Sequence, residues 1–210
     1  MRWFLTGNPG VGKTTLIRTV AERLVGITCV GFYTEEIRQR GQRTGFSIVT
    51  LDGEAGTLAS LGTQMPTVGR YSIHVEEFKK LALPLLNPET MPADLYVIDE
   101  IGKMELLSRQ FRRRINELLS QPTNVFATIT KRGNGFVDQL KRRRDAEIIE
   151  VTRKNRDELP EELARKIRSR LKVTGLVISA GGSSAIVPGR DAFSFHNAEV
   201  VVRDRTQASL

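Results

Sequence analysis

The stretch of sequence that decides the fold lies near the N-terminus and reads Gly7-Asn8-Pro9-Gly10-Val11-Gly12-Lys13-Thr14-Thr15. From Gly7 to Thr14 it matches the phosphate-binding pattern G-x-x-x-x-G-K-[ST] at every fixed position. An apolar segment, Phe4-Leu5-Thr6, precedes it, and apolar residues at helical spacing follow it between Leu16 and Leu24. The sequence therefore predicts a strand, a phosphate-binding loop and a helix over residues 1–26.

Each residue type in this loop has a physical role at a phosphate-binding site. Glycines let the backbone curl so that successive N–H groups point at phosphate oxygens, and the following helix adds the positive end of its dipole. The ammonium group of Lys13 can reach the β- and γ-phosphates of a nucleotide, and the hydroxyl of Thr14 can ligate Mg²⁺. Thr15 is either an ordinary helix residue or a donor to the α-phosphate. We expect the loop to hold a nucleotide, with Mg²⁺ as cofactor.

A second segment supplies the acidic groups that such a loop needs. Leu95-Tyr96-Val97-Ile98 is a continuous apolar run, typical of a strand covered on both faces, and it ends in Asp99 and Glu100. We predict that Asp99 helps Thr14 to hold Mg²⁺. Side chains alternate along a strand, so Glu100 points elsewhere, and we predict that it orients and deprotonates a water aimed at the γ-phosphate. The alternative for both residues is a solvated acidic strand end.

The distance between the two motifs along the chain is also informative. Residues 16–94 separate them, which leaves room for another strand between the two motif strands in the sheet. Adjacent carboxylates and such an insertion are typical of phosphate-loop enzymes that activate water with a glutamate. The guanine-reading pattern Asn-Lys-x-Asp is absent from the sequence, since Arg156 stands where its lysine would be. The sequence therefore does not specify which base the nucleotide carries.

The rest of the chain alternates between strand and helix patterns. Segments rich in β-branched and aromatic residues between Cys29 and Ile73 predict short strands and hairpins. Apolar periodicity predicts further helices at about 75–85, 111–119, 135–144 and 160–171, the last with Pro160 near its start. Short apolar runs predict further strands at 125–130 and 148–151. Strands that alternate with helices indicate an α/β fold, with a parallel sheet covered by helices on both faces.

Length and composition set the class of protein. A chain of 210 residues with 40% hydrophobic and 27% charged residues is expected to form one globular domain, here 1–171. Residues 172–210, rich in Gly and Ser, read as an appendage, either a loose tail or late strands. The single cysteine fits a reducing cytosol, and the sequence shows neither a membrane-length apolar run nor a signal peptide. We expect a cytoplasmic monomer without a membrane partner.

Five segments, in this order along the chain, resemble the thermostable nucleoside-triphosphatase family, which includes the cancer-related nucleoside-triphosphatase of animals. They are GNPGVGKTT at 7–15, GFYTEEI at 31–37, GQRTGF at 41–46, VIDEIGKMEL at 97–106 and VTRKNRDEL at 151–159. The resemblance covers about residues 2–171 and implies a RecA-like P-loop fold with inserted β-hairpins. It also implies Mg²⁺-dependent hydrolysis of ATP, GTP and other nucleoside triphosphates to the diphosphate and phosphate.

Lys103 lies in the family-like segment shortly after the two acids. It is a candidate catalytic residue, because a cation at this point can stabilise charge in the transition state. The alternative is a surface lysine or an ion-pair partner of Glu105.

Two other functions stay open from the sequence. A nucleotide or small-molecule kinase shares the size and the phosphate loop, and in it Glu100 would activate a hydroxyl group instead of water. A nucleic-acid-associated ATPase is suggested by the net charge of +8 and by two arginine triplets, Arg112-Arg113-Arg114 and Arg142-Arg143-Arg144. No aromatic residues interleave with these triplets, which weakens the nucleic-acid hypothesis.

Overall fold

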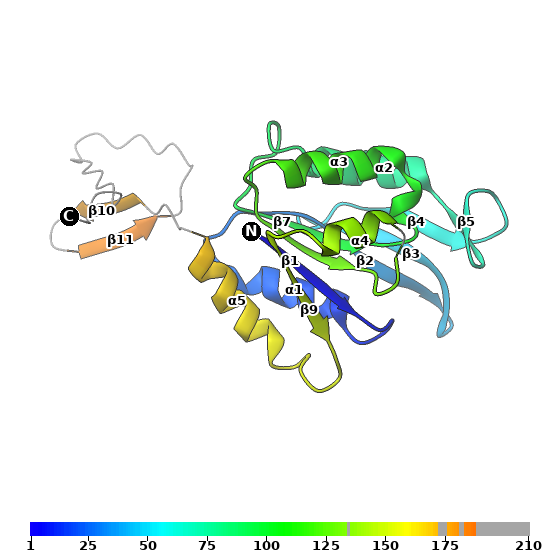
Figure 1. The fold of residues 1–210 in the computed structure, drawn as a ribbon, viewed down its shortest axis with the longest axis horizontal. Coiled ribbons are helices and arrows are strands. Elements are labelled where there is room, and N and C mark those ends of the chain that lie inside the picture. Colours follow the sequence, from blue (N-terminus) through cyan, green and yellow to red (C-terminus); the bar gives the residue numbers. More distant parts are fainter. Residues whose placement is uncertain (134, 172–175, 181–182, 188–210) are drawn as a thin grey trace.

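The computed structural model describes residues 1–133, 135–171, 176–180 and 183–187 (Figure 1). The elements follow one another as β1 (Arg2–Gly7), α1 (Lys13–Arg23), β2 (Cys29–Gln39), β3 (Gln42–Thr50), β4 (Ala55–Leu61), β5 (Thr67–Val68), β6 (Tyr71–Ile73), α2 (Val75–Leu85), β7 (Leu95–Ile101), η1 (Glu105–Leu107), α3 (Arg109–Ser120), β8 (Val125–Ile129), α4 (Gly135–Lys141), β9 (Ala146–Val151), α5 (Leu159–Arg170), β10 (Leu176–Ala180) and β11 (Ser183–Val187).

A single large sheet carries the domain, with the strand order β5-β6-β4-β3-β2-β7-β8-β1-β9. The neighbours from β2 to β9 pair in parallel, and those from β5 to β2 pair antiparallel. The predicted α/β sheet with inserted hairpins is confirmed. The two motif strands, β1 and β7, are not neighbours, because β8 lies between them. That strand follows β7 in the chain and does not come from the insertion between the motifs.

One strand belongs to both parts of the sheet. The start of β2, from Cys29 to Phe32, pairs in parallel with β7, whereas its outer part, from Phe32 to Gln39, pairs antiparallel with β3. We call β7, β8, β1 and β9 the parallel half, and β3–β6 with the outer part of β2 the antiparallel half. Register shifts in β2 after Ile37 and in β3 after Phe46 mark bulges in the antiparallel half.

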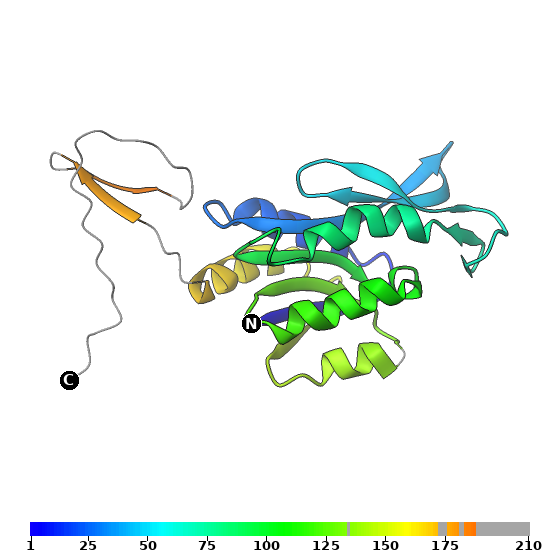
Figure 2. The same cartoon turned by 90° about the horizontal axis from the view of Figure 1, so that it is seen from above.

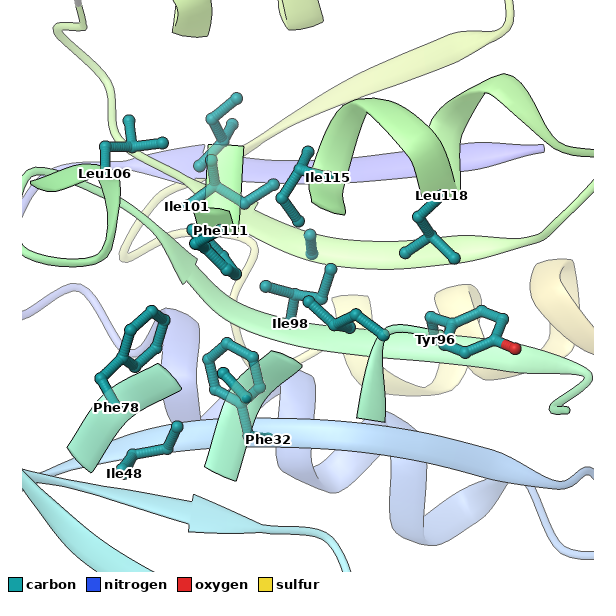
Figure 3. Close-up of a cluster of buried hydrophobic side chains, with 14 of the residues drawn as sticks. Phe32, Ile48, Phe78, Tyr96, Ile98, Ile101, Leu106, Phe111, Ile115 and Leu118 are labelled. Carbon is teal, nitrogen blue, oxygen red and sulfur yellow. The ribbon is translucent and has the colours of Figure 1, made fainter. Parts of the chain in front are cut away.

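Helices cover both faces of the sheet and define two cores. α2, α3 and α4 lie on one face, and α1 and α5 lie on the other (Figures 1 and 2). In the first core the rings of Phe32, Phe78 and Phe111 pack together, with centroids 5.0–6.2 Å apart in pairs (Figure 3). The second core contains Trp3 and the buried stripes of α1 and α5. Both stripes follow helical spacing, which is why these segments were predictable as helices.

Some boundaries differ from the sequence prediction. α5 begins at Leu159, so its start lies beside Pro160 as predicted, and both residues are buried on its apolar face. α4 ends at Lys141, whose ammonium group donates to the backbone carbonyls of Thr130 and Lys131. The short strand β5 and the 3₁₀ turn η1 were not predicted, since two or three residues show no periodicity. The Met65–Pro66 and Asp99–Glu100 peptide bonds are cis.

The predicted appendage, 172–210, lies largely outside the described residues. Within it, the backbones of β10 and β11 pair antiparallel. In the part of the chain that the structure describes, no helix combines the length and the apolar character needed to cross a bilayer.

Candidate active site

The phosphate-binding pattern forms the connection between β1 and α1. β1 ends at Gly7, and α1 begins at Lys13, with Gly12 at the cap position. Gly10 and Gly12 have φ values of +73° and +105°, which glycine adopts without the penalty that a Cβ would bring. No side chain caps the first turn of α1, so its backbone N–H groups remain available to an anionic ligand. The strand, loop and helix predicted for residues 1–26 are therefore confirmed as structure.

Asp99 is buried at the end of β7 and is enclosed by threonines. The hydroxyl of Thr14 donates to Oδ2 of Asp99 at 2.7 Å, which joins α1 directly to β7. Thr34 on β2 donates to the same oxygen at 3.4 Å through its backbone N–H and through its hydroxyl, and the hydroxyl of Thr128 on β8 donates to Oδ1. Burial raises the pKa of Asp99, while the hydrogen bonds from Thr128 and Thr14 and the charge of Lys13 oppose the rise.

Thr14 and Asp99 form a donor set that suits Mg²⁺. Both offer hard oxygen atoms, and Mg²⁺ is commonly held by one or two protein oxygens together with waters and substrate phosphates. Among the described residues there is no cluster of three His, Cys, Asp or Glu side chains that could hold a metal ion. The arrangement fits a metal held jointly by the protein and a nucleotide, and not one held in a cage of protein ligands.

Lys13 and Glu100 lie beside this pair. Nζ of Lys13 donates to the carbonyl oxygen of Gly7 at 3.4 Å, so its charge lies over the mouth of the loop. Glu100 is half-buried, and burial raises its pKa; the charge of Asp99 acts in the same direction and that of Lys13 opposes it. As the alternation along the strand predicts, the two acids have different surroundings. Asp99 is enclosed by hydroxyl groups, and Glu100 lines an open cavity.

Glu105 is a third acid at the site, although its sequence position suggested only an ion pair with Lys103. Its side chain is buried, whereas Lys103 is exposed, and no ion pair joins the two in the described structure. A Cβ on Gly102 would stand 2.9 Å from Oε2 of Glu105 and 3.0 Å from Oε1 of Glu100, so the two carboxyl groups converge on this glycine. Burial and the nearby charge of Glu100 raise the pKa of Glu105 to about 8.

A cavity of about 650 Å³ opens between the phosphate loop and the antiparallel half. One side is formed by the loop residues Gly7, Asn8, Pro9 and Lys13, and another by the segment from Glu100 to Glu105, including Lys103. The far wall is apolar and comes from the antiparallel half, and the rim carries the cations of the β8–α4 loop. The structure therefore brings Lys13, Glu100 and Lys103 to one cavity, as the sequence suggested, and their catalytic roles stay predictions.

The other flank of the phosphate loop contacts the segment after β9. A smaller cavity of about 270 Å³ lies there, between Asn8–Val11 and Glu150–Arg153. The guanidinium of Arg156 donates to the carbonyl oxygen of Val11 at 3.5 Å. Thr15 is exposed in the first turn of α1, so its hydroxyl is open to a ligand on α1. The loop thus has two distinct sides, one with the acids and one with the β9–α5 segment.

The arginine triplets lie away from this site and are partly engaged within the protein. Arg113 and Arg114 on α3 pair with Glu117 at 3.3 and 3.2 Å. Arg143 pairs with Asp145 at 2.9 Å and donates to the carbonyl oxygen of Leu119. These contacts explain part of each triplet without nucleic acid, which stays an untested partner.

The chain is similar in sequence and in fold to known nucleoside triphosphatases. A family model described as NTPase matches residues 2–164. The nucleoside-triphosphatase THEP1 of Thermotoga sp. (strain RQ2) is 43% identical over 164 residues, 78% of this chain and 93% of the relative. The cancer-related nucleoside-triphosphatase of Homo sapiens is 40% identical over 185 residues, 80% of this chain and 97% of the relative. The crystal structure of THEP1 from Aquifex aeolicus aligns with a TM-score of 0.73 at 39% identity, over 82% of this chain and 99% of that one.

Proposed function

This chain belongs to the NTPase family whose model its sequence matches, and we propose that it hydrolyses nucleoside triphosphates to the diphosphate and phosphate with Mg²⁺ as cofactor. The observation that carries the proposal is the 2.7 Å hydrogen bond from Thr14 to Asp99, with Lys13 and Glu100 beside it. It joins the end of the phosphate loop to the acidic end of β7, where a loop-bound triphosphate would meet both acids.

Binding of the triphosphate rests on the loop and on α1. The N–H groups of the loop and of the first turn of α1 would bind the phosphate oxygens, and Lys13 would neutralise charge on the β- and γ-phosphates. Thr14 and Asp99 would hold Mg²⁺ between them and the phosphates. When bound, Mg²⁺ supplies positive charge that offsets the charge of the β- and γ-phosphate oxygens.

The chemical step is assigned to Glu100. Its carboxylate would accept a proton from a water as the water oxygen bonds to the γ-phosphorus and the bond to the β–γ bridging oxygen breaks. A carboxylate whose pKa is raised by burial is a better general base than an exposed one. Lys103, on the same cavity, would stabilise the negative charge of the transferring phosphoryl group.

The sugar and base of the bound nucleotide would extend from the phosphate loop on the side opposite Asp99 and Glu100. That side offers the exposed Thr15, Arg156 and the smaller cavity beside Glu150–Arg153. The names of the relatives specify no base, which supports a substrate range that includes ATP, GTP and other nucleoside triphosphates.

Substitution of the proposed base tests the proposal. Glu100→Gln should lower turnover by about 10²–10⁴-fold, the range expected for loss of a general base, and should leave nucleotide binding intact. The measurement is phosphate release from ATP, GTP, CTP and UTP with and without Mg²⁺, together with binding of a non-hydrolysable ATP analogue. Glu22→Gln, an exposed change on α1, is the matched control. Normal hydrolysis by Glu100→Gln would show that another group activates the water.

A further inference from the structure

The cavity beside Glu100 is larger than hydrolysis alone requires. Its volume is about 650 Å³, whereas an attacking water takes up about 30 Å³. Cavities of about 300–1,000 Å³ are typical of sites for small organic ligands. Beyond the space of a terminal phosphate and one water, the cavity therefore has room for a second molecule.

The far wall of the cavity has no evident use in binding phosphate or water. It is formed by Phe46, Leu58 and Val68, from β3, β4 and β5. The ring of Phe46 is held edge-on against Tyr71, with centroids 5.4 Å apart, so this wall is firmly placed. An apolar surface that faces charged phosphates across a cavity favours a ligand that is itself partly apolar.

The rim of the cavity carries cations that are free to meet an anionic group. Lys131 is engaged by Glu150 at 2.7 Å. Arg132 and Lys103 also line the cavity and are exposed, and within the described residues neither has a carboxylate within ion-pair distance. An anion at this rim would meet positive charge that no internal acid neutralises.

The base of the nucleotide itself is not the expected occupant. In the proposed function, the γ-phosphate faces Lys13 and Glu100, and the sugar and base extend toward Arg156 and the β9–α5 segment. The large cavity, which Lys13 and Glu100 both line, would then adjoin the γ-phosphate and extend from it to the apolar wall of Phe46 and Val68. A molecule there would be placed in line to receive the phosphoryl group.

We propose that this cavity is an acceptor site for a small molecule with a flat apolar body, an anionic group and a hydroxyl group. The apolar body would lie against Phe46 and Val68, the anion at Arg132, and the hydroxyl between Glu100 and the γ-phosphate. The inference rests on the proposed function, because it uses the same loop and the same base. The protein is then a phosphotransferase as well as a hydrolase.

The transfer step balances without another reactant. The acceptor hydroxyl gives its proton to the Glu100 carboxylate as its oxygen bonds to the γ-phosphorus. The bond between the γ-phosphorus and the β–γ bridging oxygen breaks, and that oxygen stays on the nucleoside diphosphate. The products are a phosphomonoester and the diphosphate; water takes the place of the acceptor when none is bound.

The probe for the test is 4-(hydroxymethyl)benzoate, which has a ring, an anion and a primary hydroxyl. Benzyl alcohol lacks the anion, and benzoate lacks the hydroxyl. Saturation-transfer NMR should detect 4-(hydroxymethyl)benzoate on protein that is already loaded with Mg²⁺ and a non-hydrolysable ATP analogue. With γ-labelled ATP, label should appear in the ester of 4-(hydroxymethyl)benzoate, at least about tenfold more than in the ester of benzyl alcohol.

Variants connect the result to the cavity. Val68→Glu adds a negative charge to the apolar wall and Arg132→Glu reverses the rim charge, and each should weaken probe binding and transfer by about tenfold or more. Neither residue takes part in the proposed hydrolysis, so phosphate release without acceptor should persist in both. Val25→Glu and Arg144→Glu are exposed controls outside the cavity and should change neither quantity.

Two results would overturn the inference. One is loss of probe binding when the analogue occupies the loop, which would mean that the nucleotide fills the cavity. The other is label found only in inorganic phosphate, or binding unaffected by both cavity variants. The proposed function fails separately, if the wild type releases no phosphate from any nucleoside triphosphate in the absence of acceptor.

Discussion

Glu36 in the antiparallel half and Glu100 in the parallel half have pKa values shifted in opposite directions. In the antiparallel half, a hydrogen bond from Arg43 lowers the pKa of Glu36, which also pairs with Arg38 near the surface. In the parallel half, burial raises the pKa of Glu100 on β7, and it also raises the pKa of Glu105 in the η1 turn that follows this strand. Exposed pairs such as Glu36 with its arginines help to hold hairpins together, whereas buried unpaired acids oppose folding. The parallel half thus gives up stability at the place where we propose that the reaction occurs.

The halves also contribute different groups to the site. The residues proposed to bind phosphate and metal and to activate water lie near the carboxyl end of β7 (Asp99 and Glu100) and in the first turn of α1, after the loop that follows β1 (Lys13 and Thr14). Ligands generally bind at this edge of open α/β sheets. The antiparallel half adds an apolar wall on the opposite side of the cavity. The comparison predicts that substitutions of site residues in and beside the parallel half mainly lower catalytic activity. Substitutions at contacts with the antiparallel half should mainly lower the free energy of unfolding.

After Glu100→Gln, the largest effect is expected from Lys13→Ala. Loss of its charge should weaken nucleotide binding and lower turnover by about 10²–10³-fold, the size typical for one preorganised electrostatic group. Calorimetric titration with a non-hydrolysable ATP analogue and steady-state phosphate release measure the two effects. Lys80→Ala, an exposed change on α2, is the control. ATP affinity equal to that of the wild type would rule out the assigned phosphate loop.

Gly102→Ala should act on catalysis with little effect on stability. The added Cβ would stand within about 3 Å of carboxyl oxygens on Glu100 and Glu105, and these flexible ends can move aside. A small displacement of the proposed base should lower kcat by about 10–100-fold while KM changes little. Steady-state kinetics and thermal unfolding check the two parts. A fall in stability with unchanged kcat would assign Gly102 a packing role only.

Glu105→Gln should flatten the dependence of stability on pH. The pKa of Glu105 rises from about 4.5 to about 8 on folding, so the native state keeps a proton that the unfolded chain releases. Stability is therefore lost as pH rises between these values, by about 1.4 kcal/mol for each pH unit. Urea unfolding without nucleotide, at pH 6 and pH 7, should show a decline smaller by about that amount in the variant. Parallel declines in both proteins would mean that Glu105 titrates normally.

The smallest effect is expected at a contact between α1 and the antiparallel half. The guanidinium of Arg18 lies 4.4 Å from the ring centroid of Tyr33 and pairs with Glu35 at 2.6 Å. Both charged groups are partly exposed, so Arg18→Gln should cost only about 0.5–1 kcal/mol, and less at high salt. A double-mutant cycle with Glu35→Gln isolates the ion pair from the ring contact. A coupling energy of zero would leave the ring contact as the source of any loss.

The sequence predicts the parallel half better than the antiparallel half. The phosphate loop and the pair Asp99–Glu100 were identifiable because their chemistry allows few residue types at fixed spacing. Strand order was not predictable, since it depends on which distant segments pair. Glu105 was missed because it begins a short 3₁₀ turn, which has no periodicity, and its burial depends on the approach of Gly102. The cavity could not be foreseen either, because its two sides come from halves far apart in the chain.

The double pairing of β2 indicates which part of the sheet can be varied in engineered proteins. In the described sheet only this strand pairs with both the hairpins and β7. Ile48 and Leu58 share the first core with Ile98, so a redesign of β3–β6 that leaves the parallel half in register has to keep these buried residues. A library of hairpins grafted onto this scaffold would vary which acceptor molecule binds, while the residues proposed for catalysis stay unchanged. In such variants the parallel half would keep the proposed chemistry, and the antiparallel half would determine which molecule is bound.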